Sequence, residues 1–72
     1  MRIEIMSAKG DEVLAEWGPD TNAEALRAIE DKFRKLGRRG YGAFGVQTGE
    51  RMDHFDPERE EDLIFVAPLV GG

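Results

Sequence analysis

Apolar residues occupy every second position in two segments near the start of the chain, residues 2–6 and residues 12–17. This period of two is typical of a strand with one buried face. The residues predicted to face the core are Ile3, Ile5, Val13, Ala15 and Trp17. Because Gly10 lies between the segments, the sequence predicts a β-hairpin. Leu14 falls on the opposite face, where it is interpreted as an isolated exposed leucine or as a partner contact.

A three- and four-residue spacing of apolar side chains predicts one helix over about residues 21–36. Its apolar stripe consists of Ala25, Leu26, Ile29, Phe33 and Leu36. Thr21 and Glu24 match a capping box at the start of the helix, and Gly37 is placed for a left-handed cap at its end. Basic residues at the C-terminal end complement the helix dipole, with docking of an acidic partner as a second role. They are Arg34, Lys35, Arg38 and Arg39.

The second half of the chain predicts further strands. The segment 40–45 fits the glycine pattern of a dinucleotide-binding loop, but a helix precedes it where that motif requires a strand, so we interpret it as a loop. Strands are expected near residues 43–47 and 51–55, and a last strand in the apolar run 63–67. One helix packed on a mixed sheet of about four or five strands is an α+β fold.

A short tail follows the last predicted strand and consists of Pro68, Leu69, Val70, Gly71 and Gly72. Pro68 cannot donate a hydrogen bond to a sheet, so the tail is expected to leave it. Glycines have no Cβ, so Gly71 and Gly72 can pass through a narrow channel and leave the terminal carboxylate open to reaction. We therefore predict one domain, residues 1–67, and a flexible tail, residues 68–72. A frayed end or a cloning remnant is the alternative origin of the two glycines.

Length and composition restrict the chemistry that the chain can carry. A domain of 72 residues leaves little room for both a core and an enclosed active site, so we do not expect an enzyme. The absence of cysteine excludes disulfides and thiolate metal sites. His54 lies between Asp53 and Asp56, but one histidine with two carboxylates is too sparse for a closed zinc site. No metal and no bound cofactor are expected.

The charge balance restricts which partners the protein can bind. Fifteen acidic against ten basic side chains give a net charge of −5, which opposes binding to nucleic acid and to anionic membranes. The charged stretch 56–62 is interpreted as a solvated turn, with contact to a basic partner as an alternative. No apolar stretch is long enough to span a membrane. We expect a cytoplasmic protein.

The first half of the chain resembles ubiquitin and the wider β-grasp family of ubiquitin-like proteins. The segments 1–5, 13–16 and 19–21, together with Gly10, follow ubiquitin's opening pattern. The resemblance extends over essentially the whole length and implies a β-grasp fold, in which the sheet packs on the single helix.

The end of the chain resembles a different branch of this superfamily. Residues 65–72 are similar to the apolar, proline-containing ends of the molybdopterin-type sulfur carriers. Ubiquitin carries arginines before its two glycines, where this chain has Pro68 and Val70. The choice between a protein modifier and a sulfur carrier therefore stays open.

The resemblance implies a chemistry that partner proteins carry out. An activating enzyme would use ATP to adenylate the carboxylate of Gly72, with Gly71 as an unhindered spacer. In a protein modifier the acyl group passes to a thioester and then to an amine of a target protein, with a conjugating enzyme and a deconjugating protease as further partners. In a sulfur carrier, sulfide replaces AMP, and a sulfur-transfer enzyme uses the resulting thiocarboxylate in molybdopterin or thiamine synthesis. The third hypothesis is a binding module of the same fold that is never conjugated.

A partner-binding surface is expected at the root of the tail. If Leu63 and Phe65 face the helix, the residues between and after them face the other way. The predicted patch comprises Ile64, Val66, Phe44 and Ala8. The first two follow from strand alternation, and the last two from the resemblance to ubiquitin, whose corresponding strand contributes to its main partner-binding patch. An exposed apolar patch of this kind is typical of a binding surface.

Overall fold

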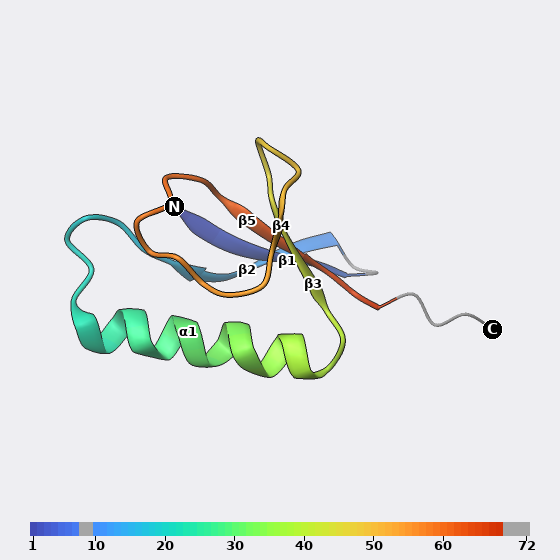
Figure 1. Ribbon diagram of the computed structural model, residues 1–72, viewed down its shortest axis with the longest axis horizontal. Helices are drawn as coiled ribbons and strands as arrows, with labels where there is room; N and C mark the ends of the chain where they lie inside the picture. Colours follow the sequence, from blue (N-terminus) through green and yellow to red (C-terminus); the bar gives the residue numbers. More distant parts are fainter. Residues whose placement is uncertain (8–9, 69–72) are drawn as a thin grey trace.

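A computed structural model describes residues 1–7 and 10–68, and within this part the chain forms five strands and one helix (Figure 1). In chain order they are β1 Arg2–Ser7, β2 Gly10–Glu16, α1 Ala23–Arg38, β3 Gly42–Gly45, β4 Arg51–Met52 and β5 Leu63–Val66. The strands form one mixed sheet in the order β2-β1-β5-β3-β4. The predicted α+β class, with one helix and about five strands, is confirmed.

The first and the last strand are neighbours in the middle of the sheet. β1 and β5 run parallel, with Ile3 opposite Leu63 and Ile5 opposite Phe65. β2 pairs antiparallel with β1, and β3 pairs antiparallel with β5. The apolar run of β5 is therefore flanked by strands on both sides; Leu63 and Phe65 are buried, whereas Ile64 and Val66 on its other face are partly exposed.

The core lies between the sheet and α1, which covers one face of the sheet (Figure 1). Its buried apolar residues are Ile3, Trp17, Ile29, Phe33, Ala43, Phe55, Leu63 and Phe65. The rings of Phe33 and Phe65 meet edge to face with centroids 5.0 Å apart, and those of Trp17 and Phe55 do so at 5.1 Å. Such pairs add to the free energy of burial. The predicted packing of the helix on the sheet is confirmed for Leu26, Ile29, Phe33 and Leu36, whereas Ala25 of the predicted stripe is exposed.

The pairing of β1 with β2 contains an irregularity at Leu14. Ala15 lies opposite Ile3, whereas Val13 lies opposite Glu4, so one extra residue of β2 falls between these two pairs. A β-bulge of this kind reverses the alternation beyond it. Leu14 is partly buried against the core, and Val13 is 49% exposed. The predictions of a core-facing Val13 and an exposed Leu14 are therefore wrong.

The helix begins later than predicted. Its N-cap is Asn22, whose Oδ1 accepts a hydrogen bond from the Ala25 amide at 2.8 Å. The hydroxyl of Thr21 accepts a bond from the Gly18 amide at 2.7 Å. The predicted capping box of Thr21 and Glu24 is wrong, because the Thr21 side chain closes the preceding turn and Asn22 takes its place.

The helix also ends later than predicted. Gly37 lies inside α1, and Gly40 is the residue with a left-handed backbone, at a φ of +91°. The amides of Gly40 and Tyr41 donate to the carbonyls of Gly37 and Leu36, each at 3.1 Å. This pair of bonds is a Schellman motif, which satisfies carbonyls at the end of the helix. The left-handed cap assigned to Gly37 therefore belongs to Gly40.

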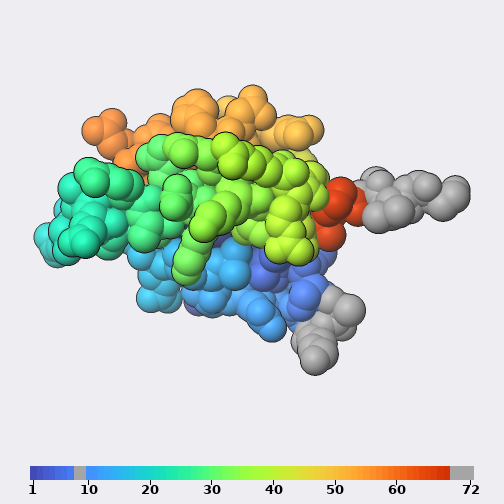
Figure 2. All heavy atoms as spheres, turned by 90° about the horizontal axis from the view of Figure 1, so that it is seen from below, coloured from blue at the N-terminus to red at the C-terminus, as the bar shows by residue number. Residues whose placement is uncertain are grey.

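The strands after the helix are shorter than their predicted ranges, 43–47, 51–55 and 63–67. β3 ends at Gly45, β4 has two residues and β5 ends at Val66. Beyond β4 the chain turns back, and Phe55 enters the core beside Trp17. Figure 2 shows the result from the helix side: α1 crosses the surface between β2 and the segment that follows β4.

Candidate functional site

The face of the sheet opposite α1 carries an apolar patch. Phe44 on β3 and Glu4 on β1 both lie opposite Ile64 on β5, and cross-strand partners share one face of a sheet. Val66 lies two residues along β5 and so faces the same way. We call this surface the sheet patch and define it as Met6, Val13, Phe44, Ile64 and Val66.

Three of the predicted patch residues, Ile64, Val66 and Phe44, are brought together on this face and are partly exposed. Ala8 lies outside the described residues. The predicted patch lacks Met6 and Val13, each 49% exposed. Strand alternation in residues 2–6 places Met6 on this face, so its membership of the patch could have been predicted from the sequence. The position of Val13 could not, because the bulge in β2 reverses the alternation there.

Gly42 lets the ring of Phe44 lie close to the backbone of β3. A Cβ built on Gly42 would stand 3.1 Å from the Cε2 atom of Phe44, so any other residue would push the ring away. Gly42 is the partner of Val66 in the pairing of β3 with β5. The ring therefore extends along the sheet toward Val66, and the patch is continuous up to the last residue of β5.

Charged side chains surround the sheet patch. Arg2 and Glu4 on β1 form an ion pair at 3.8 Å, and Arg51 on β4 lies opposite Phe44. The Nε atom of Arg51 is 3.9 Å from a carboxylate oxygen of Asp53. An apolar centre with a polar rim is the usual anatomy of a protein–protein interface.

The tail begins where the sheet patch ends. β5 stops at Val66, and Ala67 and Pro68 are exposed. A Cβ built on Gly40 would lie 3.3 Å from the Cβ of Pro68, so the root of the tail lies against the C-terminal cap of α1. The predicted tail residues Leu69, Val70, Gly71 and Gly72 lie outside the described residues, and the tail of residues 68–72 stays a prediction.

A buried carboxylate, Glu61, was not predicted. Its side chain is 4% exposed and accepts hydrogen bonds from the amides of Thr48 and Gln47 at 2.7 and 2.9 Å and from Nε of Arg59 at 2.8 Å. The bond from the Thr48 amide, followed by that from Arg59, lowers the pKa of Glu61 to about 2. The interpretation of residues 56–62 as a solvated turn is therefore wrong at Glu61.

The Glu61 carboxylate holds the loop between β3 and β4 in place. Arg59 also donates hydrogen bonds to Glu50 at 3.0 Å and to the Thr48 hydroxyl at 3.2 Å, so it links the middle of this loop to its end. A Cβ on Gly45 would come within 2.5 Å of the Glu61 carboxyl carbon, so only glycine leaves room for it. Because the amides of Gln47 and Thr48 and the guanidinium of Arg59 satisfy this carboxylate, we assign the cluster a structural role.

The described residues offer little for other kinds of site. They contain no group of three or more histidine, aspartate or glutamate side chains that could hold a metal ion. His54 is exposed. In the same part of the chain, no helix has the length and apolar character needed to cross a membrane.

Comparisons with known proteins give no match: no family model fits the chain, and searches of curated proteins and of solved structures return none. The fold and its surfaces define a small α+β protein with one helix on one face of a mixed sheet and an apolar patch on the other.

Proposed function

We propose that the protein is a ubiquitin-like modifier with a β-grasp fold, whose C-terminal glycine is activated by a partner enzyme and joined to amines of target proteins. The observation that carries the proposal is the position of the sheet patch directly at the root of a tail that ends in two glycines. A mixed five-stranded sheet packed on one helix is compatible with the β-grasp fold.

The patch and the tail are close enough to be used by one partner. Val66 belongs to the sheet patch, and Pro68 follows two residues later. Five extended residues reach at most about 16–18 Å, so residues 68–72 would carry the carboxylate that far from the body. An enzyme that docks on the sheet patch would therefore have its active site within this reach.

The chemistry needs groups that partners must supply. A carboxylate is a poor electrophile, so the oxygen of Gly72 would attack the α-phosphorus of ATP, releasing pyrophosphate and forming an acyl adenylate. A thiolate would then displace AMP, and a lysine amine would displace the thiolate to form an isopeptide bond. The chain has no cysteine, so the thiolate must belong to an activating or conjugating enzyme. A deconjugating protease would reverse the last step.

The second candidate function is a sulfur carrier. Its support is the apolar, proline-containing tail, in which Pro68 and Val70 stand where ubiquitin has arginines. Here sulfide would displace AMP, and the resulting thiocarboxylate would serve a sulfur-transfer enzyme in the synthesis of molybdopterin, thiamine or a related cofactor. The third candidate, a β-grasp binding module, uses the sheet patch alone.

Intact mass spectrometry distinguishes the three candidates. The full chain is incubated with ATP, Mg²⁺ and extract of the source organism, and a variant without Gly71 and Gly72 serves as the control. An isopeptide bond from Gly72 to a lysine supports the modifier, and exchange of one oxygen for sulfur on the intact chain supports the carrier. If neither product forms, or if the truncated variant keeps its cellular activity, the tail chemistry is refuted and the binding module remains.

A further inference from the structure

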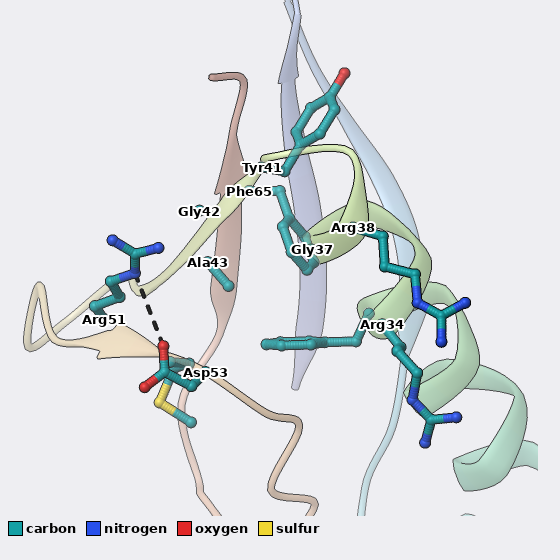
Figure 3. Close-up of a pocket in the computed structure, with 11 residues that line it drawn as sticks. Arg34, Gly37, Arg38, Tyr41, Gly42, Ala43, Arg51, Asp53 and Phe65 are labelled. Carbon is teal, nitrogen blue, oxygen red and sulfur yellow. Dashed lines mark ion pairs between the residues drawn. The ribbon is translucent and has the colours of Figure 1, made fainter. Parts of the chain in front are cut away.

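A second surface lies on the helix side of the sheet and reaches the outer strand β4, where Arg51, the cross-strand partner of Phe44, also borders the sheet patch. The C-terminal half of α1 and strands β3 and β4 enclose an open cavity of about 320 Å³ (Figure 3). Its apolar floor consists of Phe33, Ala43, Met52 and Phe65. Arg34 and Arg38 from the helix and Arg51 from β4 form its rim. We call this surface the arginine groove.

The charge of the rim differs from that of the whole chain. The protein has a net charge of −5, yet three arginines line this opening, and among the described residues Asp53 is the one acidic residue that does so. Arg34 and Arg38 are one helical turn apart, a spacing at which like charges destabilise a helix. The helix dipole accounts for basic residues on α1. It does not account for Arg51, which comes from a strand.

The existing ion pairs leave the rim available to a partner. Arg34 pairs with Glu30 at 3.0 Å on the exposed face of the helix, and Arg51 pairs with Asp53 at the longer distance of 3.9 Å. Within the described residues, no ion pair is formed by Arg38. Exposed pairs of this kind contribute little free energy, so a partner's carboxylates can replace them at small cost.

Gly37 keeps the helix wall of the groove open. Glycine inside a helix is less stable than alanine, and Gly37 does not have the left-handed backbone that would require it. A Cβ at this position would meet no atom within 4 Å. Neither the backbone nor the packing explains this glycine. Its effect is an unobstructed wall between Arg34 and Arg38.

We infer that the arginine groove docks an acidic segment of a partner protein, which inserts one apolar side chain between flanking carboxylates. Figure 3 shows Arg51 and Asp53 on one side of the opening, Arg34 and Arg38 on the other, and Phe65 between them. An extended peptide with several carboxylates offers acidic groups to both sides. The cavity is at the lower end of the range for ligand pockets, about 300–1,000 Å³, and has room for a large side chain.

The chemistry of the groove favours this occupant over others. Carboxylates meet guanidinium groups in bidentate pairs, and the apolar floor removes the anchoring side chain from water. A long polyanion such as nucleic acid, or an anionic membrane, would meet the repulsion of the whole acidic protein. A short segment with a few carboxylates interacts mainly with the arginines of the rim, and the repulsion from the rest of the protein is small. This docking does not depend on the chemistry of the tail.

A peptide titration tests the inference on the full chain. The probe is the blocked heptapeptide Asp-Glu-Asp-Phe-Asp-Glu-Asp, and its two controls replace all acids by amides or the phenylalanine by serine. Binding is followed by amide chemical shifts in nuclear magnetic resonance. We expect the shifts to concentrate on residues 33–38 and 51–53 and both control peptides to bind at least about tenfold more weakly.

Two variants of adjacent arginines separate the groove from general charge. Arg38→Glu should weaken binding by about tenfold or more, because it reverses a rim charge. Arg39→Glu is the matched control, since Arg39 is exposed at the same helix end but does not line the groove. It should change the dissociation constant by no more than about twofold. Gly37→Leu should fill the cavity and weaken binding while thermal unfolding stays cooperative.

Several results would overturn the inference. One is no binding of the acidic probe at about 1 mM, and another is an equal loss in the Arg38 and Arg39 variants. Shifts centred on the sheet patch would place the contact on the wrong face. Tighter, Arg38-dependent binding of inorganic phosphate, of a single-stranded oligonucleotide or of vesicles containing phosphatidylserine would assign the groove to a different occupant.

Discussion

Replacing Phe33 by alanine removes the ring that joins the helix to the sheet. Phe33 is 5% exposed and contacts the rings of Phe65 and Phe55, at centroid distances of 5.0 and 6.3 Å. A buried aromatic side chain removes about 150–250 Å² from water, which at about 25 cal/mol per Å² amounts to about 4–6 kcal/mol. Because alanine stays partly buried while a cavity forms, we expect a loss of about 3–5 kcal/mol in the free energy of unfolding.

This loss is large for a domain of this size. At about 0.05–0.15 kcal/mol per residue, a chain of 72 residues has a free energy of unfolding of about 4–11 kcal/mol. The Phe33→Ala variant should therefore melt about 12–40 °C lower than the parent. Urea unfolding of both proteins, followed by circular dichroism, gives the difference directly.

Phe44 provides the matched control on the other face of the sheet. Its side chain is partly exposed on the sheet patch and does not belong to the core cluster. Phe44→Ala should therefore cost less than about 1.5 kcal/mol. A loss below about 0.5 kcal/mol for Phe33→Ala, or an equal loss for both variants, would show that the core has been assigned to the wrong face.

Three further predictions concern the tail, the sheet patch and the buried carboxylate. Deleting Gly71 and Gly72 should abolish activation while the melting temperature changes little; a melting temperature several degrees lower would mean that these glycines are structural. Ile64→Asp should weaken binding to the activating enzyme with the fold intact, and unchanged affinity in a binding assay would remove the sheet patch from the proposal. The pKa of Glu61 falls from 4.5 to about 2 on folding, so its stabilising effect is complete above pH 4.5 and is lost as the pH falls toward 2. Urea midpoints between these pH values should therefore depend less on pH in Glu61→Gln, and an unchanged slope would contradict the assigned hydrogen bonds.

Local periodicity predicted most of the architecture because each element buries one face. The alternation of β1 and the apolar run of β5 placed both strands correctly, and the three- and four-residue spacing of α1 placed Ile29 and Phe33 in the core. Alternation along β5 also predicted that Ile64 and Val66, two of the four predicted patch residues, face away from the helix. These features depend on neighbouring residues alone.

The errors concern features that depend on distant or competing contacts. The bulge at Leu14 depends on the register with β1, and Gly37 and Gly40 compete for one cap. Glu61 finds its amide donors 13 and 14 residues away, so nothing in its own segment distinguishes it from the solvated acids around it. The arginine groove likewise combines Arg51 with a helix, which only the tertiary structure brings together.

The bulge in β2 also limits how other chains can join the sheet. β2 is an outer strand, and an outer strand with free amides and carbonyls is a template for a further strand. Here the bulge distorts the strand, and Nζ of Lys32 on α1 lies 3.4 Å from the Leu14 carbonyl, where it donates a hydrogen bond. At the other margin, β4 offers two residues. Strand addition and edge-to-edge aggregation are therefore disfavoured at both margins, and recognition of this protein falls to side chains on the faces of the molecule.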